Sequence, residues 1–142
     1  MDKPTQIQDC MRRNPLTIGV DAKLSQAMET IVEHKLTGIT VVDEQGCAVG
    51  ILSELDCLQS VLTAIYNDGD PAHALVQDAM TVEINSCSPA DNIVEVAQSM
   101  LQTRQRRRPV IDTGKLVGQV SSSNILWALM EHARGKVQDA RR

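Results

Sequence analysis

The segment Gln8-Asp9-Cys10-Met11 recurs 69 residues later as Gln77-Asp78-Ala79-Met80. At the same offset, Val41-Val42-Asp43 falls on Val110-Ile111-Asp112, and after one deleted residue Val49-Gly50 falls on Val117-Gly118. A sequence that matches itself at a fixed spacing is typical of a chain built from structural repeats. We therefore expect two copies of one supersecondary unit, which together span nearly the whole chain.

Each copy predicts the element order β-α-β-β-α. A short extended segment (16–18, then 84–87) precedes a helix with apolar residues at helical spacing (24–32, then 93–101). Ser88 and Pro89 predict the start of the second of these helices, as a cap and a first helical residue. A hairpin follows in each copy, with Gly46 and Gly114 at the turn positions that need a positive φ. The closing helices each carry apolar residues on one face: Leu55, Leu58, Val61, Leu62 and Ile65, then Ile125, Leu126, Leu129 and Met130.

The turn-forming run Asn67-Asp68-Gly69-Asp70-Pro71 separates the copies. We predict repeat 1 over 7–66, a linker over 67–75, repeat 2 over 76–132 and a basic C-terminal tail over 133–142. A unit of about 60 residues buries only about 60% of its unfolded surface and is marginal alone. The predicted fold class is therefore α/β (α+β), with the two repeats packed sheet to sheet about a pseudo-twofold axis.

Composition excludes several classes of function. The 142 residues carry a net charge of −4 and include no Phe, one Tyr and one Trp, so neither a basic nor an aromatic nucleic-acid surface is expected. No apolar run reaches the 18 residues that a membrane span needs, and we expect a cytoplasmic protein without a membrane partner. No Ser-His-Asp set, phosphate-binding loop or His–Cys cluster is evident, so neither an enzyme nor a metal site is expected.

The segment Gly50-Ile51-Leu52-Ser53-Glu54-Leu55-Asp56 joins the end of a predicted strand to the start of a helix. Asp oxygens suit vicinal hydroxyls, a Ser hydroxyl and helix N-terminal amides suit phosphate, and Gly lets a ligand approach the backbone. The same Ser–Asp spacing is also a capping-box pattern. The segment recurs as Gly118 to Asn124 with the Gly and Ser kept and Asp replaced by Asn.

These motifs resemble those of the cystathionine-β-synthase (CBS) domain. The similarity rests on Thr40-Val41-Val42-Asp43 with Gly50-x-x-Ser53-x-x-Asp56, and on Arg108-Pro109-Val110-Ile111-Asp112 with Gly118-x-x-Ser121, and covers residues 7 to about 132. The resemblance implies a tandem-pair sensory module, usually a homodimer, that binds AMP, ADP, ATP or S-adenosylmethionine in two clefts between the sheets. It implies no catalysis. A signal would then pass to a separate effector protein; the alternative is a constitutive interaction scaffold with decayed nucleotide sites.

Carried over by position, the resemblance implies two unequal sites. In the first, Asp56 holds the ribose hydroxyls, Ser53 lies near the phosphate, and the adenine pocket is lined by Thr17, Ile18, Gly38, Ile39 and Thr40. The second comprises Ser86, Cys87, Arg107, Arg108, Pro109, Ser121 and Asn124. Because a neutral Asn bonds more weakly than a carboxylate, roughly tenfold weaker ribose binding is expected there.

Two features of the second copy leave alternatives open. Strand alternation requires Arg107 and Arg108 to face opposite ways, so one of them is a candidate for a ligand phosphate, while the basic run as a whole also suits a solvated helix end. Trp127 is either an anchor of a dimer interface or an ordinary packing residue.

Overall fold

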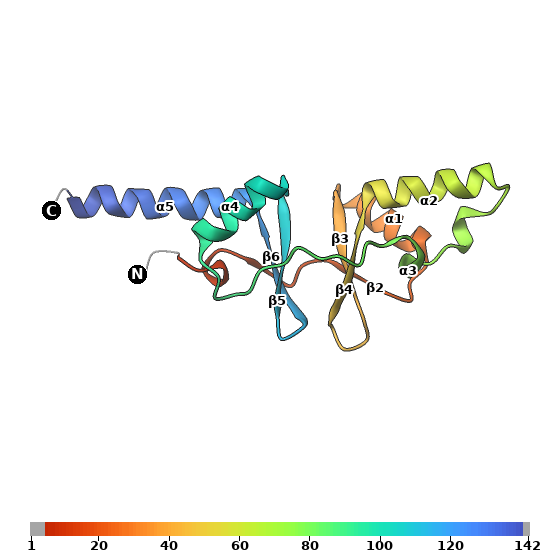
Figure 1. Cartoon of the computed structure of the whole chain (residues 1–142), viewed down its shortest axis with the longest axis horizontal. Helices are drawn as coiled ribbons and strands as arrows, with labels where there is room; N and C mark the ends of the chain where they lie inside the picture. The colour runs from red at the N-terminus through yellow and green to blue at the C-terminus, as the bar shows by residue number, and fades with distance from the viewer. Residues whose placement is uncertain (1–4, 141–142) are drawn as a thin grey trace. The chain divides into compact units, whose positions relative to one another are not determined.

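The computed structural model describes the backbone of residues 5–140 and the side chains of residues 5–134. The chain divides into two compact units. Unit 1 comprises Met1–Pro15 and Asn85–Arg142, and unit 2 comprises Leu16–Ile84. Each unit contains one three-stranded sheet and its helices, which confirms the predicted mixed α/β class (Figure 1). No helix within the described part of the chain is long and apolar enough to cross a bilayer.

Unit 2 is built around a sheet in the order β2-β3-β4. The elements in chain order are β2 (Thr17–Gly19), α1 (Leu24–Glu33), β3 (Gly38–Val42), β4 (Ala48–Ser53), α2 (Glu54–Tyr66), η2 (Pro71–His73) and α3 (Val76–Ala79). Strand β2 runs parallel to β3, which forms an antiparallel hairpin with β4. Figure 1 shows α1 and α2 on the same side of this sheet.

Unit 1 repeats this plan with a sheet in the order β1-β6-β5. The elements are η1 (Ile7–Asp9), β1 (Arg12–Arg13), α4 (Ile93–Thr103), β5 (Arg107–Asp112), β6 (Lys115–Ser121) and α5 (Ser122–Ala140). The segment expected as the first strand of this copy makes one parallel bridge, between Cys87 and Val110. As predicted, Gly46 and Gly114 have positive φ in the hairpin turns.

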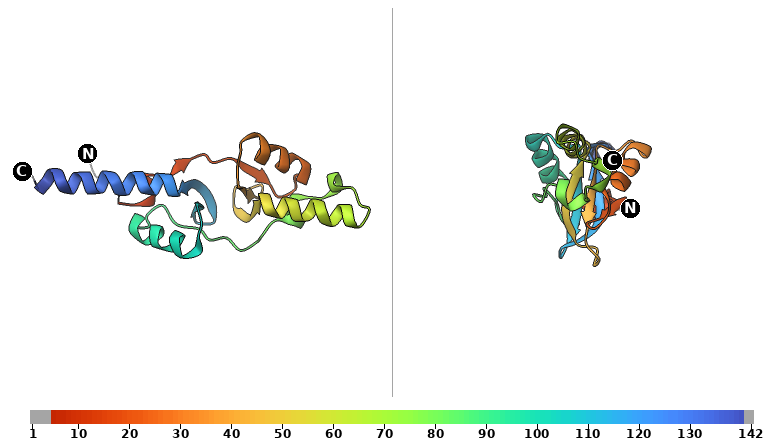
Figure 2. Two further views of the ribbon diagram at one scale, coloured as in Figure 1. Left: turned by 90° about the horizontal axis from the view of Figure 1, so that it is seen from above. Right: turned by 90° about the vertical axis from the view of Figure 1, so that its right-hand side faces the viewer.

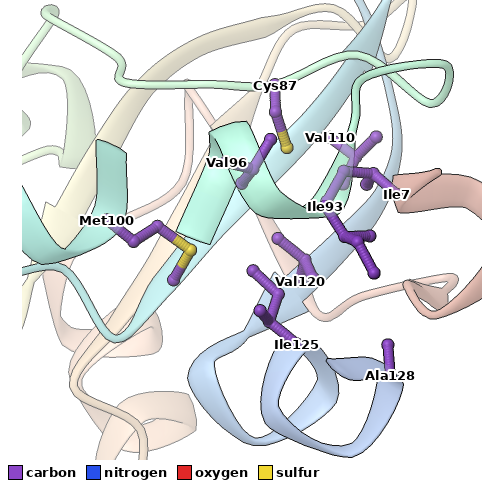
Figure 3. Close-up of a cluster of buried hydrophobic side chains, with 9 residues drawn as sticks. All are labelled: Ile7, Cys87, Ile93, Val96, Met100, Val110, Val120, Ile125 and Ala128. Atoms are coloured by element: carbon purple, nitrogen blue, oxygen red, sulfur yellow. The ribbon is translucent and has the colours of Figure 1, made fainter. Parts of the chain in front are cut away.

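Each unit has its own aliphatic core between the sheet and the helices. In unit 1, side chains from the N-terminal segment, the segment before α4, α4 itself, both hairpin strands and α5 converge (Figure 3): Ile7, Cys87, Ile93, Val96, Met100, Val110, Val120, Ile125 and Ala128. In unit 2 the corresponding cluster is Leu24, Ala27, Ile31, Ile39, Val41, Leu52, Cys57 and Val76.

The N-terminal segment of each sequence copy completes the unit formed by the other copy. Ile7, from the first copy, is fully buried in unit 1, and Val76, from the second, is fully buried in unit 2. Thr81 and Ile51 exchange two backbone hydrogen bonds of 2.8 Å, as β1 pairs with β6 in unit 1. Both views in Figure 2 show the red N-terminal segment beside the blue elements of unit 1. The boundaries of the compact units therefore differ from those of the two repeats in the sequence.

One prediction about a helix start was wrong, and the last helix extends beyond the predicted repeat. Helix α4 begins at Ile93, because the side chain of Asn92 accepts hydrogen bonds from the N–H groups of Val94 and Glu95. Ser88 belongs to the preceding turn, where its N–H donates to Asp91 Oδ2 at 2.8 Å. Helix α5 continues to Ala140 and thus through most of the range predicted as a tail; residues 141–142 lie outside the described residues.

The apolar face predicted for the first closing helix points away from the core. In α2 the buried side chain is Cys57, whereas the larger ones are exposed, at Leu55, Leu58, Leu62, Ile65 and Tyr66. In α5, Ile125 and Ala128 are buried, but Leu126, Trp127 and Met130 are exposed. The inward-facing positions of α2 carry smaller side chains, since Ser60, Val61 and Ala64 are half-buried beside the buried Cys57. Apolar spacing alone predicted the helix, and the fold decided which of its faces is buried.

Candidate functional site

The Ser53–Asp56 segment forms a complete capping box at the start of α2. The Asp56 N–H donates to Ser53 Oγ at 3.0 Å, and the Ser53 N–H donates to Asp56 Oδ2 at 2.9 Å. These two bonds satisfy amide groups that a helix N-terminus leaves without partners. Among the described residues no hydrogen bond is made to Asp56 Oδ1. The structural and the ligand-binding interpretations of this motif are therefore compatible, since one carboxylate oxygen serves the cap and the other remains an acceptor.

Four of the other predicted residues of the first site lie on one face of the unit 2 sheet. Thr17 pairs with Thr40, and Gly38 pairs with Ser53. Because side chains alternate along strands, these positions share the face opposite to the core. The side chains of Thr17, Thr40 and Ser53 thus share this face, where Thr40 is buried (5% exposed) and Ser53 Oγ connects the sheet to the cap at Asp56. We call this set the outer face of unit 2.

Ile18 and Ile39 alternate onto the other face of the same sheet. Ile39 is 4% exposed within the unit 2 core, and Ile18 packs against that core. Their side chains therefore serve packing, and only their backbone atoms remain available to a ligand on the outer face.

Sequence reasoning missed Thr81, which the fold brings beside Asp56. Its hydroxyl lies 3.5 Å from Asp56 Oδ2. The contact depends on the pairing of Thr81 with Ile51, which crosses from one sequence copy to the other. The glycine of the motif serves the same pairing, because a Cβ on Gly50 would lie 3.0 Å from the Thr81 carbonyl oxygen and 2.6 Å from Met80 Sδ. The absence of a side chain at Gly50 therefore lets the segment with Met80 and Thr81 pack against β4. The sequence instead predicts that this glycine lets a ligand approach the backbone.

Unit 1 reproduces this geometry with different side chains. The Asn124 N–H donates to Ser121 Oγ at 3.1 Å, and the Ser121 N–H donates to Asn124 Oδ1 at 3.0 Å. Arg107 pairs with Ser121, as Gly38 pairs with Ser53. Gly118 is closely approached by Met11 and Arg12, as Gly50 is by Met80 and Thr81. We call the corresponding surface, with Arg12, Arg107, Gln119, Ser121 and Asn124, the outer face of unit 1.

The remaining predicted residues of the second site divide between the two faces. Arg107 is exposed and Arg108 is 5% exposed, which matches the expected alternation. Arg108 donates to Ser99 Oγ (2.9 Å), Thr103 Oγ1 (3.3 Å) and Gln105 Oε1 (2.6 Å), so its guanidinium holds the end of α4 to the sheet. Ser86 is exposed, whereas Pro109 is buried.

Cys87 lies on the core side of the unit 1 sheet. Burial raises the pKa of its thiol to about 11, and the nearby positive charge of Arg108 opposes this shift only in part. A thiol with such a pKa is neutral at physiological pH and is a poor nucleophile or metal ligand. Within the described residues no group of three His, Cys, Asp or Glu side chains could hold a metal ion.

Two capped strand–helix junctions, each beside a polar sheet face, define a tandem module. The CBS domain model matches residues 7–63 and 76–131. These matches cover most of the chain, which therefore belongs to the CBS domain family.

Similar proteins include stand-alone modules and longer chains. The chain is 28% identical over 121 residues to the CBS domain-containing protein YhcV of Bacillus subtilis, which covers 85% of this chain and 83% of that one. It is 23% identical over 139 residues to the uncharacterized protein MJ1225 of Methanocaldococcus jannaschii, covering 94% and 48%. It is 27% identical over 147 residues to the chloroplast protein CBSX2 of Arabidopsis thaliana, and the match covers 87% of this chain and 62% of CBSX2. The chain thus spans about half to three-fifths of several curated relatives.

The crystal structure of CBSX2 in complex with AMP superposes with a TM-score of 0.78 at 27% identity. The match covers 92% of this chain and 99% of that one. The CBS-domain protein ATU1752 of Agrobacterium tumefaciens gives a TM-score of 0.69 at 26% identity, covering 91% and 96%. The tandem CBS fold predicted from the sequence is confirmed.

Proposed function

We propose that this chain is a regulatory module that binds an adenosine-containing ligand at the outer face of unit 2. The observation that carries the proposal is the free Oδ1 of Asp56, held by the capping box beside the hydroxyls of Ser53 and Thr81. A carboxylate oxygen in a fixed position accepts hydrogen bonds from the vicinal hydroxyls of a ribose. The complex of CBSX2 with AMP supports this ligand class; AMP, ADP, ATP and S-adenosylmethionine all share the adenosine group.

The proposed output is a change in the conformation of a homodimer that an effector protein reads. A ligand can shift such an equilibrium only by its difference in affinity for the two states. The exposed row on α2 supports an assembled state, because Leu55, Leu58, Leu62 and Ile65 follow the spacing of three and four residues found where helices pack together. This part of the proposal requires that the protein sediment as a dimer.

The ligand site is tested with Asp56→Asn. Asn124 shows, within this same chain, that Asn at this position keeps both bonds of the capping box. The variant should therefore lose no more than about 1 kcal/mol of stability, while the free acceptor becomes an amide donor. We expect calorimetric affinity for AMP to fall about tenfold or more.

Asp43→Asn is the matched control. It makes the same charge change in unit 2, at the turn of the hairpin, where Asp43 Oδ1 accepts from the N–H groups of Gln45 and Cys47. Its affinity for AMP should equal that of the wild type. Equal affinity of the Asp56→Asn variant would remove the site from unit 2. A ligand at 100 times its Kd adds about 2.7 kcal/mol to the free energy of unfolding and so raises the melting temperature. If AMP, ADP, ATP and S-adenosylmethionine all fail to raise it, the alternative function, a constitutive interaction scaffold, remains. The exposed apolar row on α2 favours that alternative.

A further inference from the structure

The closing helices of both units expose a row of apolar side chains. The α2 row consists of Leu55, Leu58, Leu62 and Ile65, which are between 45% and 73% exposed. On α5, Leu126 and Met130 occupy the two equivalent central positions, and Trp127 lies within one helical turn of Met130. We call Leu126, Trp127 and Met130 the α5 row. Large apolar side chains that gather on an exposed face mark an interaction site.

Two copies of the chain can cover these rows in two ways. In a head-to-head dimer, each row packs on the same row of the other copy. In a head-to-tail dimer, each α2 row packs on the α5 row of the other copy. Both arrangements bury the same side chains, and hydrophobic stabilisation follows the apolar area removed from water. Apolar burial therefore does not choose between the two arrangements, and the charge of the units decides.

The two units carry net charges of opposite sign. Residues 16–84 contain two Lys or Arg and eleven Asp or Glu, a net charge of −9. The rest of the chain contains twelve and seven, a net charge of +5. A head-to-head dimer brings the two acidic units together and the two basic units together. A head-to-tail dimer places each acidic unit against a basic one, so attraction replaces repulsion at both contacts.

Few of these charges are neutralised inside their own unit. Among the described residues, one ion pair joins a Lys or Arg to a carboxylate, and it lies on α5, where Arg134 Nη1 is 2.9 Å from Glu131 Oε1. In unit 2, Glu54 is exposed in the first turn of α2, at the start of the α2 row. In unit 1, Arg104 and Arg107 are exposed. The charges of each unit are therefore available to act on a second copy of the chain.

We propose that two copies of the chain associate head to tail, with the α2 row of each copy packed on the α5 row of the other. Trp127 and Met130 supply the kind of side chain that is enriched at such interfaces. The proposal rests on the homodimer proposed above and deepens it, because it names the surface that each helix meets. Leu55 directly precedes Asp56, so the interface begins beside the proposed ligand site. What the ligand site of one copy adjoins is thus unit 1 of the other copy.

The test mixes two double variants of the full chain that are altered at equivalent positions. The α2 variant carries Leu58→Gln and Leu62→Gln, and the α5 variant carries Leu126→Gln and Met130→Gln. Gln suits a helix and leaves the charge of each unit unchanged. All four positions are exposed, so both variants should stay folded, which circular dichroism melting checks.

Head-to-tail pairing predicts that the mixture assembles better than either variant alone. Each variant by itself pairs an altered row with an intact one at both contacts, and its dimer should dissociate at about a hundredfold higher concentration than that of the wild type. In a mixed dimer, one contact joins two altered rows and the other joins two intact rows. Sedimentation equilibrium of an equimolar mixture should therefore show association about tenfold tighter than that of either variant.

Head-to-head pairing predicts the reverse, and that result would overturn the proposal. Each variant alone would then keep one contact between intact rows, whereas the mixed dimer would keep none. Val82→Gln is the control, because Val82 is 71% exposed and lies outside both rows. It should dimerise as the wild type does, and a loss equal to that of the α2 variant would also overturn the proposal.

The response of the wild-type dimer to salt is a second test that needs no variant. Because salt screens attraction between opposite charges, the dissociation constant of a head-to-tail dimer should rise about tenfold between about 0.05 M and about 0.5 M NaCl. A dimer that tightens with salt is held against repulsion between like units, and it would overturn the orientation while keeping the homodimer. A wild type that stays monomeric would remove the homodimer and this proposal together, and calorimetry with AMP would still decide whether the chain binds adenosine.

Discussion

Unit 1 and unit 2 share one backbone plan and differ in what fills equivalent positions. Both have a capped junction between the hairpin and its closing helix, and both have a glycine against an exchanged segment. Yet unit 2 packs Leu36 and Ile39 where unit 1 has Gln105 and Arg108 joined by hydrogen bonds. A polar network replaces part of an apolar core without changing the fold. The comparison shows that backbone contacts preserve the repeat, while side chains are free to give each unit its own chemistry.

The largest effect is expected where the two units exchange segments. Ile7→Ala removes a fully buried side chain from unit 1 and should cost about 2–5 kcal/mol of unfolding free energy. Val76→Ala makes the corresponding change in unit 2. Because Trp127, the single Trp, lies on α5 of unit 1, its fluorescence in a urea titration should move more for Ile7→Ala than for Val76→Ala.

Val82→Ala is the control for these two variants, since Val82 is 71% exposed and its truncation should change stability by less than about 0.5 kcal/mol. Equal shifts of the Trp127 signal in Ile7→Ala and Val76→Ala would mean that the two units unfold together. A larger shift for Val76→Ala would contradict the assignment of each segment to its unit.

The next effect concerns the glycines that admit the exchanged segments. A Cβ on Gly118 would lie 3.0 Å from the Arg12 carbonyl oxygen and 2.7 Å from Met11 Sδ. Met11 can move its flexible end, but the backbone of β1 must shift, so Gly118→Ala should cost about 1–3 kcal/mol by chemical denaturation. Gly19→Ala is the control, because a Cβ added there would meet nothing within 4 Å. Similar losses in both variants would argue against close approach as the reason for glycine.

The smallest effect separates the units by pH. Cys87 in unit 1 occupies the position of Ile18 in unit 2. Its folded pKa of about 11 exceeds the ordinary 9.0, so the folded state keeps this proton longer than the unfolded chain. The resulting stability is complete below about pH 9 and is lost as pH rises toward 11, by at most about 1.4 kcal/mol per pH unit. Between about pH 8 and pH 10.5, the melting temperature of the wild type should therefore fall further than that of Cys87→Val. Equal falls would mean that this proton contributes nothing.

Internal repetition was enough to predict two β-α-β-β-α units, the hairpins with Gly46 and Gly114 at their turns, and the junctions at Ser53 and Ser121. The tandem CBS fold was implied by the resemblance of these motifs to that family. These features depend on residues close together in the chain, and local patterns record them directly. The opposite orientations of Arg107 and Arg108 likewise follow from strand alternation alone.

Only the tertiary structure decided which segments complete each unit, which face of α2 is buried, and that Thr81 and Arg12 border the two outer faces. All three depend on contacts between residues far apart in sequence. A repeat of 69 residues is equally compatible with each N-terminal segment packing on its own copy or on the other copy. The helix phase adds a second reason: on α2 the small residues face inward although the larger apolar ones show the stronger period. The sequence by itself determined the repeated backbone plan, and the fold determined how residues of the two copies combine into units of opposite charge.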